Sequence, residues 1–445
     1  MNINEFERLS RRDCIQRILG TATALPNILR AVTVKEPAKP PSRAPEFAAP
    51  TLSQEDDQFL EQLEKANFQF FWEQADPQTG LVKDRCNVRV EDHSTVASIA
   101  ATGFGLTALC IGEERGYAKL ADARERVINT LRFLSKTMTT HRGFFYHWAD
   151  IKTGQRVWDS EISSIDTAIL LCGVLTCREH FRSPQITRLA SDIFNRVDWT
   201  WLSEDTTLLP HGWSPTGGFL PYRWDLYSEL MMMYLLGLGS STHPLPGDAW
   251  NAWKRLTFEY DGLRYIGSYA PLFIHQYSQA WFDFRGKRDR YFDYFWNSII
   301  ATDVHRRFCI ELSTRFPDYS DDLWGITASD SQHGYVVWGG PPEMGPIDGT
   351  VVPSAPGGSL PFMPEATLRV LKNMKNRYGQ NAWCKYGFVN AFNPLKNWYD
   401  TDVIGIDTGI TMLMAENLRT GFVWYTFMRS PEAQRGLERA GFYSF

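Results

Sequence analysis

Apolar residues recur at helical spacing in about a dozen separate stretches of this 445-residue chain. Residues 94–114 are nearly all Ala, Leu, Ile and Gly, which predicts a helix buried on most sides, whereas 56–74 carries Phe and Leu at amphipathic spacing. No convincing run of alternating residues predicts a hairpin. The expected helices span 56–74, 94–114, 120–136, 160–180, 186–197, 225–236, 249–260, 273–284, 288–312, 361–378, 407–418 and 431–440.

The order of these helices constrains the fold, because nearly uncharged helices alternate with more amphipathic ones. Such a series predicts an all-α fold, a closed toroid of inner and outer helices known as the (α/α)6 barrel. An α-solenoid is the alternative, but no sequence repeats at a fixed period. In the toroid, loops at one end of the inner helices form a broad cleft. Connections as long as 316–360 are uncommon in compact domains unless they are functional.

The ends of the chain divide it into three parts. Arg11 and Arg12 followed by a short apolar region predict a twin-arginine export signal over residues 1–31. A disordered or helical cytosolic extension is the alternative. Residues 32–51 are rich in Pro and Ala and predict an extended linker. We therefore expect one domain over 52–445, in a protein that is periplasmic or secreted.

The composition excludes several classes of protein. The formal net charge of −5 leaves no basic footprint for nucleic acid, and no apolar run is long enough for a transmembrane helix. The seven cysteines follow no disulfide or zinc spacing, so we expect mostly buried free thiols. Aromatic residues make up 14% of the chain, many of them in Gly/Pro-rich stretches. They could simply fill a large core, but planar rings also suit the apolar face of a sugar.

Glu229 is the single charge in the apolar stretch that follows an aromatic loop containing Arg223 and Asp225. On a helix, its neighbours one turn away would be Met232 and Met233, with no cation to pair with it. A poorly solvated carboxyl holds its proton more tightly, as a general acid near neutral pH requires. The alternative is that Glu229 lies in the first turn of a helix, where a negative charge is favourable anyway.

Three further stretches combine carboxylates, aromatic residues and glycine. Residues 157–166 start a helix, at which Asp159 could be a simple cap. Residues 319–349 read as a binding loop on a rigid scaffold, or as an ordinary hydrogen-bonded loop. Residues 397–410 end with Asp407, either a helix cap or a general base facing a cleft opposite Glu229.

Other catalytic patterns are absent from the sequence. It has no Gly-x-Ser-x-Gly, no HExxH, no Walker loop and no dinucleotide fingerprint. The nine histidines show no metal-ligand spacing, and His275 or His333 alone is more often structural. We expect no cofactor and no metal. Among the catalytic patterns considered, the one that remains is chemistry on a sugar carried out by two carboxyl groups.

Several strings in these stretches resemble the glycoamylase-like domain of glycoside hydrolase family 144 and of cyclic β-1,2-glucan synthases. They are Trp-Asp-Ser-Glu-Ile-Ser-Ser-Ile-Asp at 158–166, Leu-Pro-Tyr-Arg-Trp-Asp-x-Tyr-Ser-Glu at 220–229, Pro-Leu-Phe-Ile-His-Gln-Tyr-Ser at 271–278, Gly-Ile-Thr-Ala-Ser-Asp at 325–330, Gly-Pro-Ile-Asp-Gly-Thr at 345–350 and Ile-Gly-Ile-Asp-x-Gly at 404–409. The resemblance runs from about residue 56 to the C-terminus. It implies an (α/α)6 barrel that acts on β-1,2-linked glucan, by an inverting mechanism in the hydrolases.

Carried over by position, the resemblance makes Glu229 the catalytic acid and Asp407 the base. The cleft-lining positions that match are Asp159, Glu161, Asp166, Arg223, His275, Asp330 and Asp348. The same stretches add four candidate substrate-binding residues, Asp225, Tyr277, Trp324 and Trp338. The chain lacks the glycosyltransferase and membrane parts of the synthases, which favours a standalone hydrolase.

We therefore expect a monomeric, exported hydrolase of β-1,2-glucan, whose partner is a β-glucan oligo- or polysaccharide. Two alternatives stay open at this point. One is a glucan-binding or glucan-transferring protein without net hydrolysis. The other is an enzyme of the same barrel class that acts on another polysaccharide.

Overall fold

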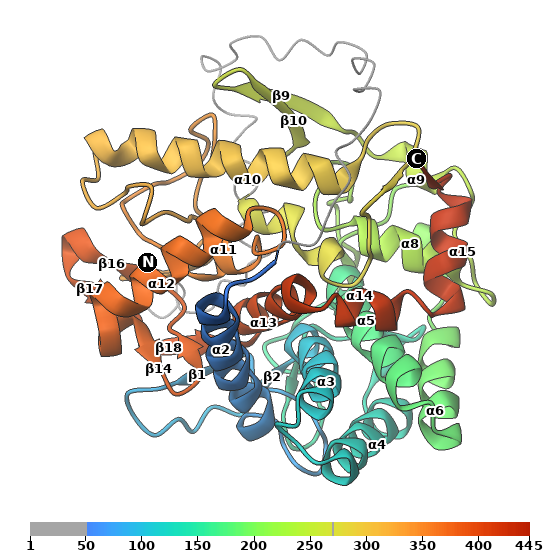
Figure 1. The fold of residues 1–445 in the computed structure, drawn as a ribbon. Coiled ribbons are helices and arrows are strands. Elements are labelled where there is room, and N and C mark those ends of the chain that lie inside the picture. Colours follow the sequence, from blue (N-terminus) through green and yellow to red (C-terminus); the bar gives the residue numbers. More distant parts are fainter. Residues whose placement is uncertain (1–50, 269–270) are drawn as a thin grey trace.

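The computed structural model describes residues 51–268 and 271–445 (Figure 1). The predicted export signal, 1–31, and all but the last residue of the predicted linker, 32–51, lie outside the described residues. Within the described part, no helix has the length and hydropathy that crossing a membrane requires. Six of the seven cysteines are described, and all six are free thiols, five of them buried, as expected.

Buried helices alternate along the chain with half-buried ones, as the sequence predicts. The buried helices are α3 (Ile99–Glu114), α5 (Ser164–Phe181), α8 (Met231–Gly239), α11 (Ser354–Gly357) and α13 (Gly405–Arg419). The more exposed helices are α2 (Gln54–Glu73), α4 (Leu120–Lys136), α6 (Pro184–Asn195), α10 (Tyr294–Glu311), α12 (Pro364–Ala382) and α15 (Pro431–Arg439). Short helices complete the set: α7 (Trp199–Ser203), α9 (Ala249–Ala252), α14 (Phe422–Phe427) and the 3₁₀ turns η3 (Leu272–His275), η4 (Tyr277–Ala280), η5 (Leu312–Thr314) and η6 (Pro394–Lys396).

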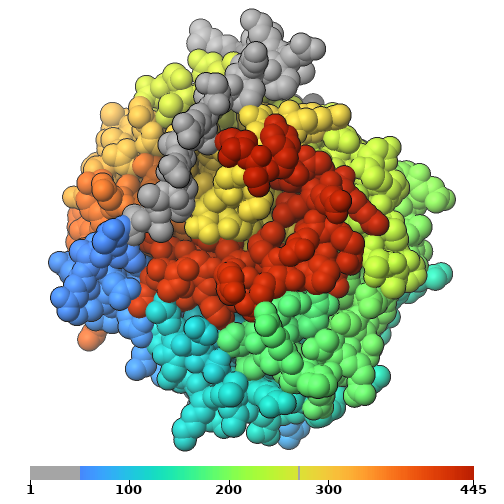
Figure 2. Space-filling model, turned by 45° about the vertical axis from the view of Figure 1, so that its right-hand side comes forward, coloured from blue at the N-terminus to red at the C-terminus, as the bar shows by residue number. Residues whose placement is uncertain are grey.

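The buried helices form a closed ring with η3 and η4, and the other long helices lie around it (Figure 1). Helix α5 packs between α3 and α8, and Ser278 of η4 accepts a hydrogen bond from the backbone N–H of Met232 in α8. The side chain of Gln276 donates to the carbonyl of Ala355 in α11, and α11 packs on α13, which returns to α3. Because the ring closes, the series is not an open solenoid. Figure 2 shows the C-terminal segment, in red, as a band across one face between the cyan and green residues and the yellow ones.

Glycine allows α3 and α5 to approach each other closely. A Cβ atom on Gly173 would lie 2.1 Å from the carbonyl oxygen of Gly103, and one on Gly103 would lie 2.6 Å from that of Ile169. These contacts are with backbone atoms, which cannot move aside as a flexible side chain can. The two buried helices therefore pack backbone against backbone at this crossing.

Short strands tie the loops together, mostly in antiparallel pairs. They are β1 (Arg85–Asn87) with β18 (Asp402–Ile404), β2 (Val96–Ser98) with β5 (Trp148–Asp150), β3 (Thr140–His141) with β4 (Phe144–Phe145), the three strands β6 (Ile162–Ser163), β7 (Gly212–Ser214) and β8 (Gly218–Phe219), β9 (Leu256–Tyr260) with β10 (Leu263–Gly267), β11 (Lys287–Arg288) with β19 (Tyr443–Ser444), β12 (Ser329–Ser331) with β13 (Gly334–Val336), β14 (Trp383–Cys384) with β15 (Gly387–Phe388), and β16 (Phe392–Asn393) with β17 (Trp398–Tyr399).

Three helix predictions were wrong in part. The helix expected at 225–236 begins only at Met231, because the backbone of Tyr227 is hydrogen-bonded to Lys254 in an extended segment. The helix expected at 273–284 is the pair of 3₁₀ turns η3 and η4. The helix expected at 249–260 ends at Ala252 and gives way to the β9–β10 hairpin. Its turn is Asp261-Gly262, both with positive φ, a hairpin signal that the sequence analysis overlooked.

Candidate active site

Strand pairs bring the beginnings of four buried helices to one end of the ring. Strand β18 leads into α13 and pairs with β1, while β2 leads into α3 and pairs with β5. Strand β6 leads into α5 and pairs with β7. Pro210, just before β7, forms a β-bridge with Arg223, which precedes α8. Most of the predicted acids lie here, where the positive ends of helix dipoles favour carboxylates.

Glu229 lies in the turn just before α8 rather than inside that helix. Only 3% of the residue is exposed, so it is poorly hydrated, as the sequence predicts. Ser278 donates from Oγ to the backbone carbonyl of Glu229 over 2.8 Å and accepts from the N–H of Met232 over 3.0 Å. One hydroxyl thus fixes the main chain on both sides of the carboxyl group.

The loop before Glu229 is fixed by aromatic packing. The ring of Trp224 stacks on His211 at 4.0 Å between centroids and donates from Nε1 to Ser164 in α5. Arg223 pairs with Glu204, and the Asp225 carbonyl accepts a hydrogen bond from the N–H of Lys254. Arg223 therefore serves to hold the loop in this structure.

A second group of acids surrounds His147 at the start of α5. Its two ring nitrogens lie 3.3 Å from Glu161 and 3.5 Å from Asp166. Asp166 also accepts a hydrogen bond from Ser163, the residue that caps α5. Asp159 caps no helix, because its side chain is fully exposed at a positive φ. Glu161 and Asp166 therefore lie together, and Asp159 lies apart on the surface.

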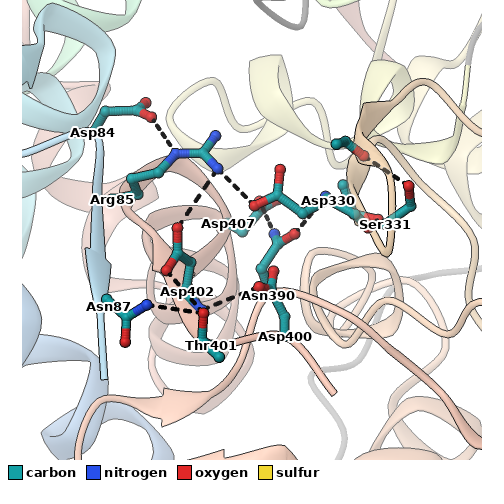
Figure 3. A network of polar contacts seen from close by, with 12 residues as sticks. Asp84, Arg85, Asn87, Asp330, Ser331, Asn390, Asp400, Thr401, Asp402 and Asp407 are labelled. Carbon is teal, nitrogen blue, oxygen red and sulfur yellow. Dashed lines mark hydrogen bonds and ion pairs between the residues drawn. The ribbon is translucent and has the colours of Figure 1, made fainter. Parts of the chain in front are cut away.

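Asp407, in the first turn of α13, is 9% exposed, and its carboxyl group is held by neutral donors. Ser354 donates to Oδ1 over 2.9 Å, and the amide of Asn390 donates to Oδ2 over 2.7 Å. The Asn390 carbonyl oxygen accepts from the backbone N–H of Asp330 over 2.7 Å (Figure 3). Asn390 thus connects two of the predicted site residues.

Arg85 is the cation at the centre of the neighbouring acidic cluster (Figure 3). It lies 3.0 Å from Asp84, 2.6 Å from Asp330 and 3.8 Å from Asp402. Burial opposes the charge of Arg85, but the carboxylates outweigh burial and raise its pKa. Burial likewise raises the pKa of Asp330 and of Asp402.

Asp400 is a further member of this cluster, and its pKa is also raised. Burial, followed by the negative charge of Asp330, raises its pKa to about 8. It is 7% exposed, and its Oδ2 has no hydrogen-bond partner among the described residues. At neutral pH this residue therefore carries a proton more often than not.

The other predicted binding residues are buried or make contacts within the protein. His275 shares a hydrogen bond of 3.1 Å with Tyr227. Burial, followed by the electrostatic interaction with His305, lowers the pKa of His275 to about 3, so it is neutral at neutral pH. Tyr277 packs edge-on to Phe104 in the core. The remaining three are Trp324, which is completely buried, Trp338, which donates to Ser329, and Asp348, which accepts from Lys396.

Four residues of the site were not predicted from the sequence: Arg85, His147, Asn390 and Asp400. The adjacent charges of Asp84 and Arg85 and the position of Asp400 in an acid-rich stretch were available signals. A single neutral amide such as Asn390 gives no comparable signal in the sequence.

The described residues that could jointly ligate a metal ion lie elsewhere. They are Glu113, Glu114 and His180, at the C-terminal ends of α3 and α5. His180 and Glu113 already share a contact of 2.7 Å. Any metal there would be remote from Asp407.

Comparisons with known proteins agree on one group of relatives. The Glycoamylase family, described as "Putative glucoamylase", matches residues 221–431. A crystal structure from Bacteroides uniformis, described as a "putative glucoamylase", is 31% identical to this chain, with a TM-score of 0.82. The match covers 89% of this chain and 99% of that one. The endo-β-1,2-glucanase from Chitinophaga pinensis, solved with sophorotriose and glucose, is 29% identical with a TM-score of 0.82, over 88% and 99% of the two chains.

A curated relative is the exo-β-1,2-glucooligosaccharide sophorohydrolase (non-reducing end) of Parabacteroides distasonis, 27% identical over 88% of this chain. The chain spans 59% of the length of that relative. The chain shares a mostly helical, barrel-type architecture with these relatives, two of which are named as enzymes that act on β-1,2-glucan or its oligosaccharides. The chain belongs to the Glycoamylase family, and its structural relatives include endo-β-1,2-glucanases of the glycoside hydrolase family 144 type.

Proposed function

We propose that this protein hydrolyses β-1,2-linked glucan by an inverting mechanism, with Glu229 as general acid and Asp407 as general base. The observation that carries the proposal is that both buried carboxyl groups stand at the start of buried helices joined in one ring. The relatives support the choice of linkage, since two of them are named as enzymes that act on β-1,2-glucan or its oligosaccharides.

We further infer that the ring and the helices around it form an (α/α)6 barrel. Six inner segments, α3, α5, α8, η3–η4, α11 and α13, would then meet the cleft with their N-terminal ends. The helix that packs on the outside of α8 is α15. The segment that directly follows α8 does not supply it, because α9 is short and is followed by the β9–β10 hairpin. The long loops before α8, α11 and α13 would line the cleft.

In the proposed reaction, Glu229 transfers its proton to the glycosidic oxygen as the C1–O bond breaks. A water attacks C1 from the opposite face and gives its proton to Asp407, directly or through a substrate hydroxyl. Both carboxyl groups are buried, and Asp407 accepts hydrogen bonds from the neutral donors Ser354 and Asn390. The proposal gives the two acids opposite roles, with Glu229 as proton donor and Asp407 as proton acceptor.

The test is incubation of the purified protein with linear β-1,2-glucan, followed by NMR of the fresh products. We expect new reducing ends whose anomeric configuration is inverted. Sophorose alone would indicate exo action, and a mixture of lengths would indicate endo action. Binding of the glucan without any new reducing ends, or cleavage only of β-1,3-, β-1,4-, β-1,6- or α-linked substrates, would overturn the proposal.

We also propose that the protein is exported, as a monomer, to the periplasm or beyond. Support comes from the sequence alone, in Arg11 and Arg12 ahead of a short apolar region. Changing both arginines to lysine should leave the protein in the cytoplasm on fractionation. Equal fractionation of the wild type and the double variant would refute export, and light scattering would test the monomer.

A further inference from the structure

A small cavity lies directly behind Asp407, between α2, α11 and α13. It measures about 20 Å³. Its polar lining comes from Asn67, Ser354, Asn390, Asp407, Thr408 and Thr411. A water molecule needs about 10–15 Å³ and two to four polar partners, so the cavity is large enough and polar enough for one.

Asn67, on α2, brings an unsatisfied acceptor to this cavity. The residue is 2% exposed, and its Oδ1 has no hydrogen-bond partner among the described residues. Its Nδ2 donates to the carbonyl of Tyr386 over 2.8 Å. Since a carbonyl can only accept, this bond fixes the amide orientation and leaves Oδ1 as the atom that needs a donor. A buried acceptor that is left without a donor is destabilising.

We propose that one buried water occupies this cavity and donates one hydrogen bond to Asn67 Oδ1 and the other to the Asp407 carboxylate. A carboxylate accepts about four hydrogen bonds, so the bonds from Ser354 and Asn390 leave it able to take a donor from this side. Thr408 and Thr411 offer hydroxyl oxygens along the same wall. The water satisfies Asn67 and ties the outer helix α2 to the site.

The consequence for the site rests on the proposed function, in which Asp407 is the base. A donor to the carboxylate favours its charged form and lowers its pKa. Asn67 is then a positioning residue that acts on Asp407 through the water. Without it, Asp407 should remain protonated to a higher pH.

The first test is a crystal structure of the full chain at a resolution that shows ordered water. We expect a water within about 3.2 Å of both Asn67 Oδ1 and an Asp407 carboxylate oxygen. An empty cavity, or a water that does not contact Asn67 Oδ1, would overturn the proposal. This result is independent of activity, so it stands whether or not the protein cleaves glucan.

The second test compares Asn67→Leu with the matched control Asn417→Leu. Asn417 is also buried and also donates to a backbone carbonyl, that of Ala280, but it lines no part of this cavity. We expect Asn67→Leu to lose the water and to move the acid limb of kcat/KM upward by about one pH unit, against no shift in the control. A folded Asn67→Leu variant with the wild-type acid limb would remove the link to Asp407. If that variant does not fold, the wild-type crystal structure decides the proposal.

Discussion

The side-chain amide of Asn390 donates a hydrogen bond of 2.7 Å to Oδ2 of Asp407, while its own oxygen accepts from the backbone of Asp330. An amide does not titrate, so it supplies this donor at every working pH. The acidic cluster around Arg85 is thereby joined to Asp407 through a neutral group rather than through a second charge. Asn390 therefore lies between the proposed base and the acidic cluster of Asp84, Asp330, Asp400 and Asp402.

Asn390→Asp should place a second carboxylate against Asp407. Like charges disfavour ionisation, so the pKa of Asp407 should rise and the acid limb of kcat/KM should move to higher pH. We expect the acid limb to move up by about one pH unit, so that activity well below its midpoint falls about tenfold. The measurement is the pH profile on linear β-1,2-glucan, with the exposed Asn381→Asp as control. An unchanged acid limb would separate Asn390 from the base.

Glu229→Gln should keep the shape of the side chain and remove its transferable proton. We expect kcat to fall by about 10²–10⁴ with little change in KM, because general acid catalysis contributes about that much. An aryl sophoroside whose leaving group departs without protonation should lose much less. The control is Glu125→Gln, an exposed position on α4. Equal losses on both substrates would argue for a structural effect, and full activity on the glucan would remove the assignment.

Asp400→Asn should stabilise the protein increasingly as pH rises. The folded-state pKa of Asp400 is raised to about 8 by burial and then by Asp330, so the folded protein retains a proton that the unfolded chain releases near pH 4. The free energy of unfolding of the wild type therefore falls as pH rises between those values, and each unit of pKa difference corresponds to about 1.4 kcal/mol.

The neutral amide removes this dependence, so the advantage of Asp400→Asn should grow from pH 5 to pH 8 and level off above. Urea unfolding at several pH values measures it. The exposed Asp248→Asn should show no such trend. An advantage that stays constant from pH 5 to pH 8 would show that Asp400 is ionised in the folded protein throughout this range.

Gly173→Ala should destabilise the protein by about 3 kcal/mol or more, because the new methyl would meet the backbone of Gly103. Helix propensity alone would favour alanine by about 1 kcal/mol, so the sign of the change distinguishes packing from propensity. Urea midpoints give the result. Gly247→Ala, where a Cβ meets no atom within 4 Å, is the control. A Gly173→Ala variant as stable as the wild type would mean that α3 and α5 can separate without cost.

The sequence predicted the features that local patterns encode. The apolar run at 94–114 marked α3 as a buried helix, and Glu229 and Asp407 stood out as acids among apolar residues. Both are buried in the structure. The family strings, which resemble the glycoamylase-like domain, identified the relatives that the comparisons confirmed.

Only the tertiary structure decided which distant segments meet. Arg85 reaches Asp330 across 245 residues of sequence, and Asn390 reaches Asp407 from a loop with no distinctive pattern. The predicted helix does not extend before Met231, because the backbone N–H of Tyr227 donates to the carbonyl of Lys254 instead of to a carbonyl one helical turn earlier. Periodicity and propensity report the environment that a residue prefers along its own segment. They do not report its partners, because those depend on how the closed ring brings the ends of separate helices together.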